Sequence, residues 1–307
     1  MKQPQFLIMD LASAAPPRKR SLQDDSRLIE LLQAGRWEDA RNLLKTTSIH
    51  FQTDPSPLAV ACRLGAPYDC VKAILDEDPA KLRHVLDARG TPLHEAIVCE
   101  NMGPPVIQAL LDADEALGTS STRATLLQDV DGFTPLHLLI RRRFQSHMMD
   151  LPTGSSFMAI LEMLARSCPD SVTIPDRGEY EEPPIVYAIK ANIYSPAVLT
   201  GPPHLDEDDN SVAIVEREIY NMVECMLKYC PRAATCVFEG YRGQYTALHS
   251  AVFHGRHSST IRLLLESEGN NGEEAGASSR AALLANTQGE LPLHFCAMRG
   301  ERPQSIS

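Results

Sequence analysis

The chain has 307 residues, of which 43% are hydrophobic and 6% aromatic, and its formal net charge is −11 at pH 7. This charge argues against nucleic acid as a partner, because the molecule as a whole repels a polyanion. The eight cysteines include no Cys-x-x-Cys pair, which disfavours a disulfide framework or a zinc cluster and favours a reducing compartment. No apolar run reaches the roughly 18 residues that a membrane span needs.

The N-terminal segment, residues 1–21, is predicted to be disordered or extended. Its apolar run at residues 6–9 is short, and the basic cluster at residues 18–20 follows that run. A secretory signal has the opposite order, with the basic residues first. We therefore expect a cytoplasmic protein, and the basic cluster keeps the nucleus open as an alternative.

A first pair of helices is predicted over residues 22–48, with Gly35 between them. Ala40, Leu43 and Leu44 have the i, i+3, i+4 spacing that places three side chains on one face of a helix. This pair lacks the turn sequence that opens all the later units.

Six later segments open with versions of one short sequence. The best copies read Thr-Pro-Leu-His-Glu-Ala from Thr91 and Thr-Pro-Leu-His-Leu-Leu from Thr134. Proline suits the first helical position, where its missing N–H would have no partner. The threonine hydroxyl can cap the turn, and the histidine ring can bridge backbone groups of adjacent repeats. The other openings begin at Ser56, Pro183, Thr246 and Leu291.

The first five openings are each followed by a second helix with the same apolar i, i+3, i+4 spacing. The five trios begin at Val71, Ile107, Ile160, Val223 and Ile261. Three of these helices are expected to stop at a proline, because proline cannot continue a helix: Pro79, Pro169 and Pro231. Three first helices are expected to stop at a glycine: Gly65, Gly255 and Gly300.

These units resemble the ankyrin-repeat family, whose repeats run about 33 residues and carry a Thr-Pro-Leu-His-x-Ala signature. Residues 129–137 match the family's turn and helix start nearly throughout. The resemblance implies an all-α fold, an ankyrin-repeat solenoid of stacked helix–turn–helix units with long loop insertions. It covers residues 22–300 in about six to seven units, the first lacking the Thr-Pro turn and the last incomplete, and leaves a tail at residues 301–307.

Two neighbouring units carry extra length between their paired helices. Pro135 to Ile160 is 25 positions and Pro184 to Val223 is 39, whereas Pro57 to Val71 is 14. Insertions of about 11 and 25 residues are therefore expected side by side on one edge of the solenoid, and residues 150–156 and 201–210 are predicted to be loops. The acidic run at 206–209 could attract a cation or a basic partner, or form a solvated loop.

No catalytic signature is present. The sequence lacks a Gly-x-Ser-x-Gly elbow, a phosphate-binding glycine-rich loop with a following lysine, and a His-Glu-x-x-His pair. His254 and His257 have no cysteine or carboxylate at ligand spacing, so no metal and no cofactor are predicted. The four signature histidines (94, 137, 249 and 294) are assigned a structural role, and the protein is not expected to be an enzyme.

The resemblance places the partner on a concave face made by turn tips and first helices. In the six openings, the fourth and fifth positions after the signature histidine hold five Lys or Arg residues and no Asp or Glu. The formal net charge of the whole chain is nevertheless −11. This contrast predicts a basic groove with apolar spots for an acidic, partly apolar peptide; alternatively, exposed helix positions simply favour Arg and Lys. The candidate partner-binding residues are Arg63, Asp131, Phe133, Arg141, Arg142, Lys190, Phe253, His254, Met298 and Arg299.

The resulting expectation is a monomeric, non-enzymatic protein–protein interaction scaffold. The alternative is a regulatory or targeting ankyrin portion of a larger, truncated multidomain protein. Too few residues follow Gly300 for a partner helix, which would leave the apolar side chains of the last opening uncovered.

Overall fold

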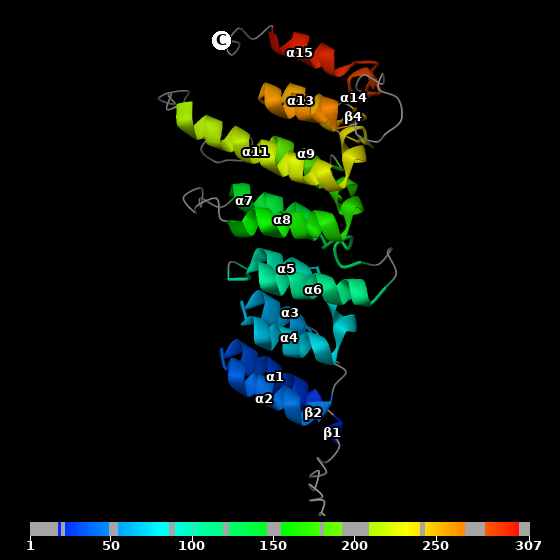
Figure 1. Cartoon of the computed structure of the whole chain (residues 1–307). Coiled ribbons are helices and arrows are strands. Elements are labelled where there is room, and N and C mark those ends of the chain that lie inside the picture. The colour runs from blue at the N-terminus through cyan, green and yellow to red at the C-terminus, as the bar shows by residue number, and fades with distance from the viewer. Residues whose placement is uncertain are drawn as a thin grey trace, which may run out of the picture.

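The computed structural model describes residues 18–19, 22–48, 55–85, 90–99, 101–118, 123–145, 155–178, 181–191, 209–239, 243–267 and 280–300. Over these ranges the chain forms one continuous row of helical hairpins (Figure 1). The fold is an all-α repeat solenoid, as predicted. The predicted tail at residues 301–307 lies outside the described residues.

The helices form two rows, and each helix contacts its counterpart in the neighbouring hairpin. The first row consists of α1 (Leu22–Gln33), α3 (Pro57–Arg63), α5 (Pro92–Val98), α7 (Pro135–Gln145), α9 (Pro184–Lys190), α12 (Ala247–Phe253) and α15 (Pro292–Gly300). The second row consists of α2 (Trp37–Thr46), α4 (Tyr68–Glu77), α6 (Pro104–Ala116), α8 (Ser155–Ser167), α11 (Asp209–Tyr229) and α13 (Ser258–Glu266). A short helix, α14 (Arg280–Leu283), contacts both α13 and α15.

The remaining elements are short. Two strand pairs are present: β1 (Arg18–Lys19) runs parallel to β2 (Thr47–Ser48), and β3 (Val237–Phe238) runs antiparallel to β4 (Tyr245–Thr246). The three prolines predicted to end second helices each follow the helix closely and begin a 3₁₀ turn. These turns are η1 (Pro79–Arg83), η4 (Pro169–Thr173) and η5 (Pro231–Ala234).

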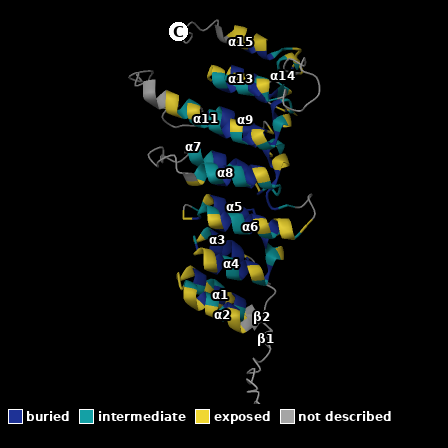
Figure 2. Cartoon of the chain, viewed as in Figure 1, coloured by how far each residue is buried: buried dark blue, intermediate teal, exposed yellow. Residues whose placement is uncertain are grey.

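One hydrophobic cluster runs the length of the stack, from Leu28 in α1 to Phe295 in α15. The apolar trios of the second helices supply much of it, and Val71, Ile74 and Leu75 are all essentially inaccessible. Figure 2 shows both buried and exposed residues on second-row helices such as α4 and α6, which bury one side. The short first-row helices α3, α5 and α12 are instead buried at six of their seven residues. A fully buried Leu or Ile contributes about 1.5–3 kcal/mol, and no single hairpin could bury these side chains alone.

The signature histidines connect one hairpin to the next. The Thr91 N–H donates to Nδ1 of His94 at 2.9 Å, so Nδ1 is the acceptor and the neutral ring carries its proton on Nε2. Nε2 in turn lies 3.0 Å from the carbonyl oxygen of Phe133 in the following hairpin. His137 reaches Glu182 O at 2.9 Å and His249 reaches Glu290 O at 3.2 Å in the same way. The predicted bridging role of these rings is confirmed.

Glycines end two of the first helices as predicted. Gly65 and Gly255 follow α3 and α12 with φ of +70° and +62°, in the left-handed region that glycine enters without steric cost. Gly300 differs, because it is the last residue of α15 itself.

The second insertion is partly helical, which corrects the loop prediction. Helix α11 begins at Asp209, well before Val223, so the predicted loop at 201–210 overlaps its first turn. The extension is stable because Ile219 and Met222 continue the apolar stripe and are fully buried. Helix α8 likewise begins at Ser155, inside the loop predicted at 150–156. The rest of both predicted loops lies outside the described residues.

Two ion pairs fix the extended half of α11 from both sides. Glu218 accepts from Arg143 of α7 at 2.6 Å. Glu216 accepts from Arg256 at 2.7 Å and from the backbone N–H of His257 at 3.0 Å. The end of α7 and the first half of α11 are therefore neighbours.

Candidate protein-interaction surface

The predicted partner-binding residues belong to the first row of helices and to the turns next to them, a region here called the first-helix face. This face consists of the turns that precede the first-row helices and the C-terminal ends of those helices. Asp131 and Phe133 lie in the turn before α7, and most of the others lie at the ends of α3, α7, α9, α12 and α15. Successive first-row helices are in contact, so these residues follow one another along the stack.

The turn before α7 is held rigid by one carboxylate. Oδ1 of Asp129 accepts from the backbone N–H groups of Asp131 at 3.0 Å and Phe133 at 2.8 Å. Gly132 has φ +83°, and a Cβ there would come within 2.3 Å of the backbone nitrogen of Arg177. Only glycine fits this close approach between neighbouring turns. Asp131 is exposed at the tip.

Four side chains form an aromatic cluster across two hairpins: Phe133, His137, Arg141 and Tyr187. The Phe133 and Tyr187 rings meet edge to face with centroids 5.9 Å apart, and His137 lies 5.2 Å from Tyr187. The Arg141 guanidinium stands 4.8 Å from the Phe133 centroid. Tyr187 also donates to Oδ2 of the buried Asp176 at 2.5 Å. Phe133, Arg141 and Tyr187 are only partly buried, so the cluster is accessible, while the ring contacts and the Tyr187 hydrogen bond restrain its side chains.

Two of the predicted binding cations are engaged within the stack. Nη1 of Arg142 donates to the carbonyl oxygens of Ile97 at 2.7 Å and Cys99 at 3.2 Å, and so satisfies the C-terminal end of α5. Lys190 forms an ion pair with the buried Glu182, which also accepts from the Tyr245 hydroxyl at 3.0 Å. Among the described residues, Arg63 and Arg141 form no ion pair.

Apolar side chains occupy the remaining positions of the first-helix face. Phe253 is 46% exposed and packs edge to face on Phe295 with centroids 6.0 Å apart. His254 follows it, 5.0 Å from its ring. Met298 and Val98 are exposed at the corresponding places on α15 and α5. The side chain of Arg299 lies outside what the structure describes.

Burial shifts the pKa of several histidines and cysteines of the stack. Burial lowers the pKa of His94 and of His137 to about 4, so both rings are neutral. Burial also raises the pKa of the Cys70 and Cys225 thiols to about 11, and these thiols are protonated. Within the described ranges, no three His, Cys, Asp or Glu side chains are placed to hold a metal ion. His257 is the N-cap residue of α13, and its ring accepts a hydrogen bond from the backbone N–H of Ser259.

Tyr187 and Tyr245 were missed as surface residues by the sequence prediction. Tyr187 lies in the opening that begins at Pro183. It directly follows the position that the signature histidine occupies in the best copies. Its signal was available, because the same position in the last opening is the aromatic Phe295. Tyr245 gave no such signal, because its partner Glu182 is 63 residues away.

Comparison with known proteins supports the fold. No protein-family model matches the chain, and neither does any curated protein sequence. Among solved structures, an ankyrin repeat protein from Leishmania major superposes with a TM-score of 0.52 at 14% identity, covering 89% of this chain and 76% of that one. The structure of the Bd0816 predatory endopeptidase from Bdellovibrio bacteriovorus in complex with immunity protein Bd3460 gives a TM-score of 0.45 at 16% identity, over 80% of this chain and 92% of that one.

No helix in the described part of the chain is both long and apolar enough to cross a bilayer. The repeated capped openings, the two rows of helices and the likeness to the Leishmania structure agree with one another. The chain therefore has an ankyrin-like fold.

Proposed function

We propose that this chain is a non-enzymatic protein-interaction scaffold that binds a protein or peptide segment across the first-helix face. The aromatic cluster is the observation that carries the proposal. It combines two aromatic rings and an arginine, which are the residue types that dominate binding energies at protein interfaces. Because its members are held by Asp129, Asp176 and their own stacking, they lose little conformational freedom when a partner binds.

The chemistry of this face favours a segment that is acidic and partly apolar. Arg63 and Arg141 supply positive charge, although Arg141 also interacts electrostatically with the nearby Asp129 carboxylate. Phe253, Met298 and Val98 supply apolar contact. Arg142 and Lys190 act mainly within the stack, so they contribute less to recognition than their charge implies. We place the strongest contacts around Phe133, Arg141 and Tyr187.

Charge reversal at Arg141 tests this proposal. Arg141→Glu should weaken binding of the partner about tenfold or more, because it removes the cation from the Phe133 ring and opposes an acidic segment. Tyr187→Ala should have a similar effect through lost contact area. The partner is identified by quantitative mass spectrometry of material captured on the wild type, and its affinity for each variant is then measured by calorimetry.

Arg166→Glu is the matched control, because Arg166 is exposed on α8 in the second row. Reversal of Arg142 or Lys190 is less informative, since either change also disrupts a contact within the stack. Equal affinities of wild type, Arg141→Glu and Tyr187→Ala for the captured partner would show that the first-helix face is not the binding surface.

A further inference from the structure

An open groove of about 630 Å³ lies between α4 and α6, in the second row of helices. This volume is in the range of about 300–1,000 Å³ typical of binding pockets. Its apolar and acidic surface comes mainly from Tyr68, Leu75 and Asp76 on α4 and from Ala109, Asp112 and Ala113 on α6. Leu75 is only 1% exposed whereas Tyr68 is 44% exposed, so the groove has an apolar floor and an accessible aromatic wall.

Small side chains on α6 explain why the groove is open. Ala109, Ala113 and Ala116 recur at i, i+4 and i+7 and therefore line one side of the helix. They face α4 without filling the space between the two helices.

The corresponding space between α8 and α11 is bridged. Aligning the trio that begins at Val223 with the one that begins at Ile107 puts Tyr229 at the position of Ala113. The Tyr229 hydroxyl donates to Oε1 of Glu162 on α8 at 2.6 Å, and Lys228 donates to the same oxygen at 2.9 Å. The bridge between α8 and α11 has no counterpart between α4 and α6, where the space stays open.

The walls of the groove carry an excess of negative charge. Asp76 and Asp112 stand exposed on opposite walls. Lys72 is the only cation in the lining, and it already donates to Asp76 at 2.5 Å. Gln108 donates to Asp112 at 2.6 Å but adds no charge. Because Asp76 is paired with Lys72, the two aspartates and one lysine of the lining leave a net charge of −1, centred on Asp112. An apolar floor beside this acidic wall is complementary to an apolar ligand surface flanked by cations.

We propose that this groove binds a basic amphipathic helix of a protein partner. The apolar side chains of that helix enter the alanine-lined floor, and its Lys or Arg residues contact Asp76, Asp112 and the face of the Tyr68 ring. A helix is the fitting ligand because both walls are helices and offer no strand edge for an extended peptide to pair with. The lining comes from α4, α6 and the residues just after them, Pro79 and Leu117, so this site does not depend on the first-helix face.

The test uses the full chain and a fluorescein-labelled peptide of about 18 residues, long enough to form a helix, built from Leu at i, i+3, i+4 and Lys elsewhere. A Leu/Glu peptide of the same pattern and a scrambled Leu/Lys peptide are the comparison probes. We expect fluorescence anisotropy to show saturable binding of the patterned basic peptide, at least about tenfold tighter than that of either comparison probe.

Two variants locate the binding site. Ala113→Tyr inserts the side chain found at this position in α11 and should weaken the basic peptide about tenfold or more, whereas Ala213→Tyr, at an exposed site on α11, should leave it unchanged. Asp76→Asn combined with Asp112→Asn should weaken binding several-fold and reduce its salt dependence. The control is Asp39→Asn combined with Glu224→Gln, which removes two exposed charges elsewhere.

Thermal melting establishes whether Ala113→Tyr is folded, and if it is not, the paired aspartate variants decide alone. Absence of saturable binding, equal affinity for the three peptides, or unchanged affinity in the groove variants would overturn the proposal. Loss of a self-associated species in Ala113→Tyr, seen by sedimentation, would also overturn it, because the occupant would then be a second copy of the chain.

Discussion

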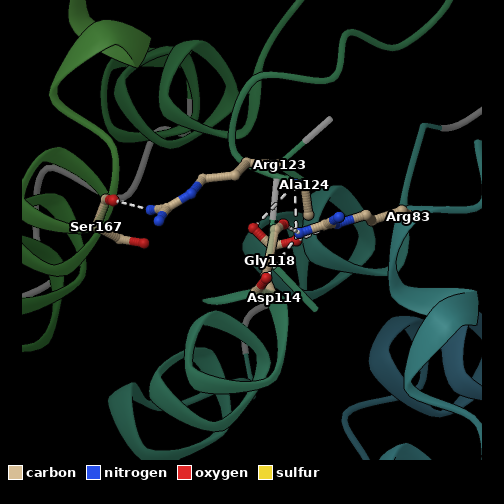
Figure 3. Close-up of polar contacts among 6 residues, drawn as sticks. All are labelled: Arg83, Asp114, Gly118, Arg123, Ala124 and Ser167. Carbon is tan, nitrogen blue, oxygen red and sulfur yellow. Dashed lines mark hydrogen bonds and ion pairs between the residues drawn. The ribbon is translucent and has the colours of Figure 1, made fainter. Parts of the chain in front are cut away.

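Replacing Asp114 with alanine is expected to lower the free energy of unfolding by about 3 kcal/mol or more. The Asp114 side chain is 1% exposed, and its Oδ1 lies 2.7 Å from Nε of Arg83, which is itself largely buried. Both of its carboxylate oxygens also accept from the Ala124 N–H at 3.1 Å (Figure 3). Removal of the carboxylate leaves a buried guanidinium charge and a buried amide without this partner, and breaking a buried pair in this way costs about 3–5 kcal/mol.

The effect should be concentrated in the middle of the stack. Arg83 also donates to the carbonyl oxygens of Asp114 and Gly118, while Arg123, next to Ala124, donates to Ser167 O at the end of α8 (Figure 3). This network ties η1, α6 and α8 together. Hydrogen exchange should therefore report the loss of protection mainly in these elements, because a repeat stack transmits stability between neighbours.

Two substitutions control for side effects at this site. Asp114→Asn keeps the shape and some acceptor capacity but not the charge, so it should lose less stability than alanine. Asp112→Ala, exposed two residues away, should change stability by less than about 0.5 kcal/mol. Urea unfolding followed by circular dichroism measures all three. A loss for Asp114→Ala no larger than that for Asp112→Ala would show that the ion pair is energetically unimportant.

The sequence predicted the repeating fold because its signals are local. A Thr-Pro opening, a histidine three residues after the threonine and an apolar trio all act within one hairpin, and the repetition of these signals indicates stacking. The extension of α11 was missed although its signal is equally local. Val215, Ile219 and Met222 continue the helical apolar spacing upstream of Val223, but the Gly-, Pro- and Asp-rich residues before them favoured a loop.

The surface was harder to predict, because its chemistry depends on contacts between distant residues. Phe133 and Arg141 were identified individually, but their stacking with Tyr187 depends on the packing of α7 against α9. Arg142 was predicted to face a partner on the first-helix face. It instead donates to the carbonyl oxygens of Cys99 and Ile97, which are 43 and 45 residues away. Charge counts along a sequence cannot separate a cation that faces solvent from one that caps a neighbouring helix.

Mild acid is expected to destabilise the stack through its buried histidines. Burial lowers the pKa of His94 and His137 to about 4, whereas an unfolded histidine titrates near 6.5. Their contribution is fully present above pH 6.5, because both states are then neutral. Between pH 6.5 and 4 the unfolded chain binds protons that the folded chain does not, so stability falls by roughly 1–1.5 kcal/mol per pH unit for each histidine.

The geometry explains why the folded rings resist protonation. Nδ1 of His137 accepts from the Thr134 N–H at 3.1 Å, and a proton on that nitrogen would break this bond and point at another donor. The opposite nitrogen still donates to Glu182 O, so protonation disrupts the hydrogen bond at the start of α7 and not the contact with the next hairpin. Burial also lowers the pKa of His249, which adds to the effect in the same direction.

Melting temperatures measured by circular dichroism between pH 7 and 4.5 test this assignment. The wild type should lose stability steeply below pH 6.5, whereas a His94→Gln and His137→Gln double variant should start less stable at pH 7 and show a shallower slope, because glutamine does not titrate. His257→Gln, at an exposed histidine that takes no part in the bridges, is the matched control. Parallel slopes for the wild type and the double variant would assign the acid sensitivity to carboxylates instead. In that case the histidine bridges would be structural bonds without a role in the pH response.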